Sequence, residues 1–191
     1  LHSTSRRQRL MCIRDRTWSA GVALAATFTA VARSHPLGIV IVAGTGTVST
    51  LSFSLGSVTV RTVPGAWSTL TAAGIAVARG GESVGAGAVI WPTNASSAVL
   101  HSPDGVTWTN QPVGSGQVVS ACWSEAYGKW FALTTLGLLY SSPNPSTTAW
   151  SLIATLFNSA GGPNFNSIRA VGRSLVIACG LGGAPVPYTT D

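Results

Sequence analysis

Few side chains in this chain have the types and spacing that catalysis requires. From residue 17 onward the sequence holds four acidic residues, Glu82, Asp104, Glu125 and Asp191. Hydrolysis of a glycosidic bond by the usual mechanism needs two carboxylates flanking the scissile bond. Asp104 and Asp191 close turn-like stretches (SPDG and YTTD), so only Glu82 and Glu125 are left to form such a pair.

The remaining reactive residue types are isolated. No histidine has a second histidine four residues away or an acidic partner at ligand spacing, so we expect no metal site; the histidines are His2, His35 and His101. Cys122 and Cys179 lie in apolar segments without a C-x-x-C pair, which predicts buried free thiols, with a disulfide between them as the alternative. No glycine-rich loop precedes a helix pattern that could receive a phosphate, so we expect no cofactor.

The basic charge is concentrated at one end of the chain. The formal net charge is +6 and the isoelectric point is about 10.1. Five of the eleven basic residues precede residue 17: Arg6, Arg7, Arg9, Arg14 and Arg16. The rest of the chain has six basic and four acidic residues, a net of +2 without a cluster. Nucleic acid is therefore not an expected partner. No run of 18 apolar residues occurs, so no membrane span is predicted.

Residues 1–16 allow three interpretations. They could be a basic arm that binds nucleic acid, although a bare charge run is weak evidence for one. They could be the basic region of a secretory signal followed by the apolar stretch 20–32. The third, which we favour, is a non-native segment, because the string STSRRQRLMCIRDR over residues 3–16 resembles translated sequencing-adapter read-through at the end of a metagenomic reading frame. We therefore take the domain as residues 17–191.

A tryptophan recurs along that domain in similar contexts. Each copy follows Ala or Thr and precedes Ser or Thr: Trp18, Trp67, Trp108 and Trp150. The spacings are 49, 41 and 42 residues. A period in the low forties is typical of the four-stranded blade of a β-propeller. We expect each tryptophan to open the fourth strand of its blade, and we expect these large side chains to pack between blades rather than to bind a ligand.

Between the tryptophans, apolar segments alternate with turns at spacings near ten residues. The first strands are expected at 28–33, 75–79, 118–123 and 165–171, and the second strands at 38–44, 87–91, 129–133 and 174–180. The second strands are apolar almost throughout, which indicates burial on both faces. The sequence therefore predicts an all-β propeller of four-stranded antiparallel blades, with 22 glycines and 10 prolines for its many turns.

One turn carries a family resemblance. The stretch Ser102-Pro103-Asp104-Gly105-Val106-Thr107-Trp108 resembles the Asp-box, or bacterial neuraminidase repeat, and the S-x-D-G-x-x-W turns of phage-tail and bacterial surface propellers. The usual sialidase form has one more residue between the aspartate and the tryptophan. A weaker copy has Asn144 in the aspartate position, and a third ends at Asp191. In that family the box is a folding element at the blade rim, so the resemblance implies a structural role for Ser102, Asp104, Gly105 and their counterparts.

The repeat predicts blade units at 25–71, 72–112, 113–155 and 156–191, with an orphan outer strand at 17–24. Two arrangements fit. The chain could be a fragment of a propeller with six or seven blades, which we favour. Alternatively, the strand at Trp18 could pair with the one at Tyr188 and close a four-bladed ring.

The expected function is a non-enzymatic binding or structural module that recognises a glycan or a protein, in an extracellular, cell-surface or virion setting by resemblance. Candidate binding residues are Trp91 and Trp123, which lie outside the tryptophan repeat, and Glu125 and Tyr127 in the turn WSEAYGKW. Packing against a neighbouring blade is the role that we favour for both tryptophans. A scaffold or assembly-factor propeller is a further possibility.

A fragment of a sialidase-like glycoside hydrolase is the alternative from another class. It requires carboxylates, a tyrosine and arginines to converge in one pocket, and the candidates are Arg79, Glu82, Glu125, Tyr127 and Arg169.

Overall fold

The computed structural model describes residues 27–34, 37–52, 58–78, 87–93, 96–156 and 165–179. Several predictions lie outside these residues: the segment 1–16, the strand at 17–24 with Trp18, the turn at Asp191, and the side chains of Arg79 and Glu82. Of Cys179 only the backbone is described.

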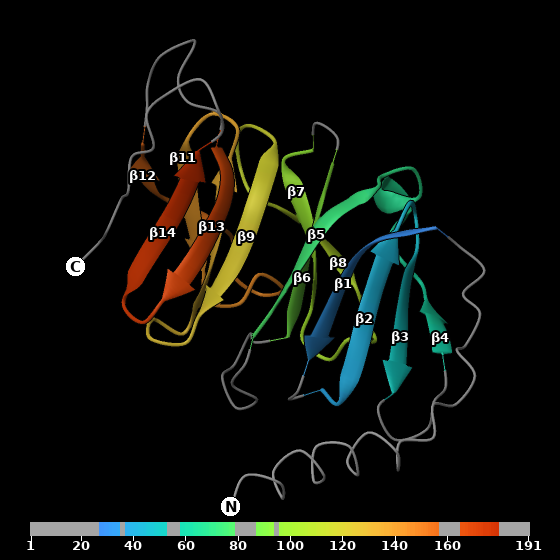
Figure 1. Ribbon diagram of the computed structural model, residues 1–191. Coiled ribbons are helices and arrows are strands. Elements are labelled where there is room, and N and C mark those ends of the chain that lie inside the picture. Colours follow the sequence, from blue (N-terminus) through green and yellow to red (C-terminus); the bar gives the residue numbers. More distant parts are fainter. Residues whose placement is uncertain are drawn as a thin grey trace, which may run out of the picture.

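The described strands form four antiparallel sheets, each in sequence order (Figure 1). The first sheet is β1 (Phe28–Ser34), β2 (Ile39–Gly44), β3 (Val48–Ser52) and β4 (Val58–Arg61). The second is β5 (Ala72–Val77), β6 (Ala88–Pro92), β7 (Ala98–Ser102) and β8 (Thr109–Pro112). The third is β9 (Val118–Ser124), β10 (Lys129–Thr134), β11 (Leu138–Ser142) and β12 (Ser151–Thr155). The fourth contains β13 (Phe165–Val171) and β14 (Ser174–Cys179). The predicted four-stranded antiparallel sheets are confirmed.

The sheets stand side by side, and their first strands are neighbours. β1 packs against β5, β5 against β9 and β9 against β13 (Figure 1). We call these four the inner strands. The strands farthest from them within the complete sheets are β4, β8 and β12. Consecutive hairpins explain this order, because each strand pairs with the one that precedes it.

The continuously apolar second strands build the core on both of their faces. Neighbouring side chains of a strand point to opposite faces of its sheet. In β6, Ile90 therefore contributes to the core shared with the first sheet, whereas Val89 contributes to the core shared with the third. In β10, Trp130 faces the second sheet and Phe131 faces the fourth. Three apolar cores thus alternate with the four sheets.

The position of Trp67 corrects the predicted repeat. Trp108 and Trp150 directly precede β8 and β12, the fourth strands of their sheets, as expected. Trp67 instead ends a 3-10 turn, Gly65–Trp67, that follows β4 and leads to β5. Pro64 and Gly65 favour this turn, because proline fixes its own φ and glycine adapts to a tight bend. Trp67 is nevertheless buried between the first two sheets, and its indole Nε1 donates a 2.7 Å hydrogen bond to Asn110 Oδ1.

Candidate functional site

The Asp104 turn joins β7 to β8 through hydrogen bonds within the turn. Oδ1 of Asp104 accepts hydrogen bonds from the backbone N–H groups of Val106 (2.7 Å) and Thr107 (2.9 Å) and from the hydroxyl of Ser102 (3.0 Å). The Ser102 Oγ also accepts the Gly105 N–H at 2.8 Å. Partial burial raises the pKa of Asp104, but the combined hydrogen bonds lower it more, and the net pKa lies below its ordinary value.

Gly105 places this turn against the neighbouring sheet. Its φ of +72° is a conformation that favours glycine. A Cβ at this position would also overlap the Cδ1 atom of Ile39 in β2. The turn at Asn144 is a looser version of the same device, because Asn144 Oδ1 accepts a single described backbone hydrogen bond, from Ser146 at 3.1 Å. Both turns hold backbone in place.

The tryptophans outside the repeat are buried. Trp91 is 7% exposed and Trp123 is 8% exposed, and both belong to the core between the second and third sheets. The ring of Trp91 lies over Gly74 of β5, where a Cβ would overlap it. Trp91 therefore presents no exposed aromatic face, because Gly74 gives the ring space inside its own sheet. The favoured packing role describes both side chains.

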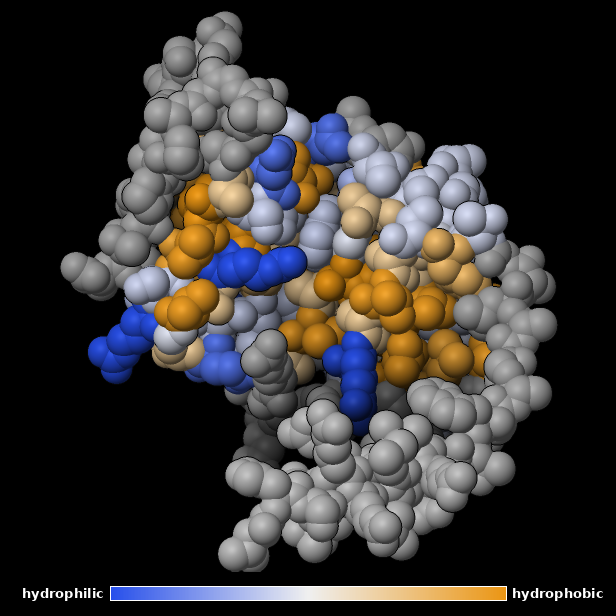
Figure 2. Space-filling view, viewed as in Figure 1, coloured by the Kyte–Doolittle hydropathy of each residue, from blue (hydrophilic) through white to orange (hydrophobic). Residues whose placement is uncertain are grey.

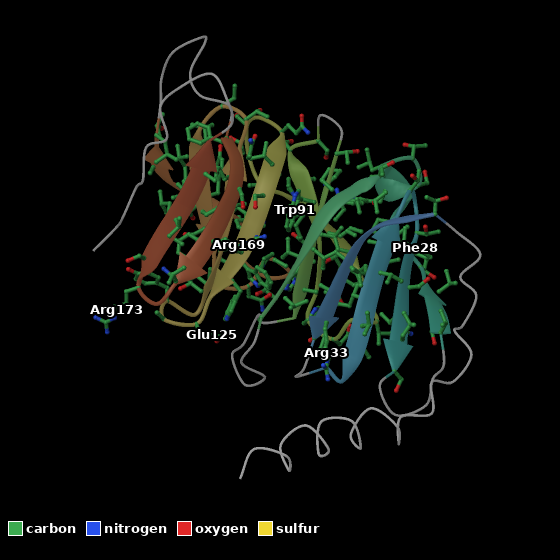
Figure 3. The ribbon with its side chains drawn as sticks, viewed as in Figure 1. Phe28, Arg33, Trp91, Glu125, Arg169 and Arg173 are labelled. Atoms are coloured by element: carbon green, nitrogen blue, oxygen red, sulfur yellow. The ribbon has the colours of Figure 1, made fainter. Side chains whose placement is uncertain are left out.

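A cavity of about 540 Å³ lies where three inner strands meet. Figure 3 shows Arg169 on β13 and Glu125 near the end of β9, on the side of the molecule that the inner strands form. The cavity is lined by Ile75, Ala76 and Val77 of β5, Cys122 and Trp123 of β9, Glu125 and Ala126 of the following turn, and Arg169, Ala170 and Gly172 of the last hairpin. We call it the inner cavity.

Arg169 is the basic side chain that lines the inner cavity. It is exposed, and its Nη1 donates a long hydrogen bond of 3.4 Å to the carbonyl of Ile168. The Cys122 thiol beside it is a free thiol, so the alternative of a disulfide to Cys179 does not hold. Burial raises the pKa of Cys122 to about 12, more than the positive charge of Arg169 and a hydrogen bond with the Ala170 backbone lower it. The thiol is therefore neutral at physiological pH and supplies no counter-charge to Arg169.

Tyr127 is placed beside the inner cavity but is not one of its lining residues. Its hydroxyl donates a 2.8 Å hydrogen bond to the Arg173 carbonyl, and its ring lies edge-on to Phe131 with centroids 6.0 Å apart. The phenol thus ties the turn after β9 to the turn of the last hairpin. Of the five residues required by the hydrolase alternative, Glu125 and Arg169 share a cavity, Tyr127 is turned to Arg173, and Arg79 and Glu82 lie outside the described residues.

Sequence reasoning did not identify the role of His101. Its side chain is buried in β7, and Nδ1 lies 2.6 Å from the Ser146 Oγ of the third sheet's Asn144 turn. The imidazole also meets the Trp130 ring edge-on, with centroids 6.1 Å apart. His101 joins the second and third sheets. Among the described residues, no group of three or more His, Cys, Asp or Glu side chains could hold a metal ion.

A second hollow, of about 460 Å³, lies at the outer edge of the first sheet. It runs between the end of β4 and the Asp104 turn and is lined by Val60, Arg61, Thr62, Val63, Pro64, Val106, Thr107 and Trp108. We call it the outer groove.

Across the described part of the chain, no helix is long and apolar enough to cross a membrane.

The chain is similar in fold to solved β-propellers. It matches the Cps50 (Swd1) β-propeller domain of Myceliophteria thermophila with a TM-score of 0.55 and 13% identity, over 82% of this chain and 50% of that one. It matches YCF48 of Cyanidioschyzon merolae with a TM-score of 0.56 and 13% identity, over 84% and 50%. A chain of a mitotic checkpoint complex gives a TM-score of 0.57 and 11% identity, over 82% and 45%.

These likenesses confirm the predicted β-propeller fold. The chain spans about half the length of the solved chains that it matches. No protein-family model matches the sequence, and no curated protein matches it.

Proposed function

We propose that this chain is part of a larger, non-enzymatic β-propeller that binds a protein partner at the inner cavity. The carrying observation is that three consecutive sheets bring Arg169, Glu125 and an apolar wall to one open hollow. The volume of the inner cavity lies within the range typical of ligand-binding pockets, about 300–1,000 Å³. The propeller fold supports a binding or structural role, since such folds hold loops and edges on a rigid frame.

The finer assignments are also proposals. We infer that the blade division is 25–71, 72–112, 113–155 and 156–191, that residues 1–16 are non-native, and that the parent protein is of phage-tail or bacterial surface type. The turn geometry at Ser102, Asp104 and Gly105 supports the resemblance to an Asp-box, because these residues bond to the turn itself. Sequencing the parent gene across both ends of this segment tests the second and third proposals, and an experimental structure of the parent protein tests the blade division.

The binding proposal is tested by selecting peptides from a random library on the full chain. The selected peptides are then compared on two tryptophan variants. Ala126→Trp places a large ring at the rim of the inner cavity, where Ala126 is exposed. Val60→Trp is the matched control, since Val60 is 68% exposed on β4. We expect at least tenfold weaker binding to Ala126→Trp and unchanged binding to Val60→Trp. Equal binding to both variants contradicts the proposal.

A glycan is the other class of ligand for this module. Indole rings that are buried offer no exposed face for stacking a sugar, which favours a peptide at the inner cavity. A glycan array probed with the parent protein distinguishes the two ligands, and saturable binding to one glycan type would replace the peptide proposal.

The hydrolase alternative is favoured by one observation, the shared cavity of Glu125 and Arg169. Its test is release of the fluorophore from a fluorogenic sialoside by the wild-type chain and by Glu125→Gln. Turnover that disappears in Glu125→Gln supports the hydrolase alternative. Absence of turnover by the parent protein contradicts the hydrolase alternative.

A further inference from the structure

We propose that the inner cavity recognises a carboxylate, the side chain of an Asp or Glu residue in a peptide segment, and that Arg169 is the residue that holds it. This inference rests on the proposed binding function and names the ligand chemistry of the same site.

The first argument is the unused donor capacity of Arg169. A guanidinium carries five N–H donors in a planar fork that matches the two oxygens of a carboxylate. Its described hydrogen bond is a single long one, 3.4 Å, to the Ile168 carbonyl. The neighbouring Cys122 is a neutral thiol. The guanidinium of Arg169 therefore has N–H donors left for an acceptor-rich, negatively charged group in the cavity.

The second argument is the wall around Arg169. Ile75, Val77, Ala126 and Ala170 are apolar residues among those that line the same hollow. The methylene groups of an Asp or Glu side chain would contact these side chains and displace water from them. A charge pair in a partly dehydrated hollow is stronger than the same pair in water. Figure 2 shows one apolar area over β1 and β2 and another over β14, with a hydrophilic band between them over β13, the strand that carries Arg169.

Glu125 makes a peptide the favoured carrier of the carboxylate. Glu125 lines the cavity just after the end of β9, and its label lies below that of Arg169 in Figure 3. A peptide can bring backbone N–H donors for the Glu125 carboxylate together with an acidic side chain for Arg169, whereas a phosphate dianion offers no donors to offset its repulsion by Glu125.

The test uses the peptides selected on the full chain. The tightest one is synthesised twice, once as selected and once with each Asp or Glu replaced by Asn or Gln. Both forms are titrated into the wild-type chain, Arg169→Gln, Arg169→Lys and the control Arg173→Gln. Arg173 is exposed in the turn of the same hairpin and does not line the cavity. Melting temperatures are measured for every variant, and the neutral peptide tests the charge without altering the protein.

We expect acidic peptides to be selected. Their affinity should fall at least tenfold on neutralisation of the peptide and in Arg169→Gln, and to an intermediate extent in Arg169→Lys, while Arg173→Gln binds as the wild type does. Neutral peptides, or acidic ones that bind Arg169→Gln equally well, overturn this inference; if Ala126→Trp still abolishes their binding, the proposed function stands. A peptide affinity that is the same for Ala126→Trp as for the wild-type chain overturns both proposals.

Discussion

The imidazole Nδ1 of His101 in β7 lies 2.6 Å from the hydroxyl Oγ of Ser146, so a buried side chain of the second sheet is hydrogen-bonded to a turn of the third. The same ring meets Trp130 edge-on. Two neighbouring sheets are therefore joined by a polar contact at the edge of an apolar core. A buried polar group such as this imidazole destabilises the fold when it loses its hydrogen-bond partner.

Replacing His101 should destabilise the fold strongly. His101→Ala removes a fully buried ring, leaves a cavity against Trp130 and strips Ser146 of its partner, and we expect a loss of about 2–4 kcal/mol in the free energy of unfolding. Ser146→Ala should cost less, about 1 kcal/mol, because the ring stays in place. Urea unfolding measures both, with Thr147→Ala as an exposed control. A cost for His101→Ala no greater than that of the control would contradict this account.

The Asp104 turn should depend on a charged acceptor. Asp104→Ala deprives two backbone N–H groups and the Ser102 hydroxyl of their acceptor, with an expected loss of about 1–2 kcal/mol, as for a lost helix cap. Asp104→Asn keeps an oxygen acceptor, as Asn144 does in the next sheet, and should cost less. Chemical denaturation of the two variants checks the order.

The same carboxylate makes stability depend on pH in a stated direction. The folded-state pKa of Asp104 lies below its ordinary value, so its contribution is fully present above the unfolded pKa of about 4 and is lost as pH falls toward the folded pKa. Asp104→Asn has no such proton. We expect the stability difference between wild type and Asp104→Asn to shrink as pH is lowered from 6 to 3. A constant difference over that range would refute the assignment.

Glycines with positive φ should differ according to what lies beside them. Gly105 and Gly128 have φ of +72° and +57°, but a Cβ at Gly105 would overlap Ile39, whereas a Cβ at Gly128 would meet open space. Gly128→Ala should therefore cost only the backbone term, about 1 kcal/mol, and Gly105→Ala roughly 1–3 kcal/mol more. Thermal unfolding compares them directly. Equal melting temperatures would mean that the turn is not pressed against β2.

The buried thiol of Cys122 should react only when the fold opens. With a folded-state pKa raised to about 12, it holds almost no thiolate at pH 8. In a background of Cys12→Ser and Cys179→Ser, iodoacetamide should label the native chain far more slowly than the urea-unfolded chain. Fast labelling of the native chain would show that this side chain is accessible.

The fold class could be predicted from sequence because it rests on local pattern. The apolar stretches at 87–91 and 129–133 coincide with β6 and β10, where continuous burial comes from sheets on both sides. The recurrence of the tryptophans in similar contexts gave a wrong prediction at one position. Trp67 follows its fourth strand instead of preceding it, and its indole still reaches the same kind of core.

The candidate site could be predicted only in part. Glu125 and Arg169 were recognised as chemically apt, but their shared cavity depends on β9 packing beside β13, a contact that no local pattern encodes. Packing was the favoured role for Trp91, but the space that holds its ring is set by Gly74 on the paired strand, a contact that the residues around Trp91 do not encode.

The central claim is that a partner binds at the inner cavity, and hydrogen–deuterium exchange with and without the tightest selected peptide tests it most directly. The peptide should slow exchange in the segments 122–128 and 169–173, which contribute most of the cavity's polar lining, and leave 58–64 and 103–108 unchanged. Slowed exchange confined to 58–64 and 106–108 would place the partner in the outer groove and contradict the claim.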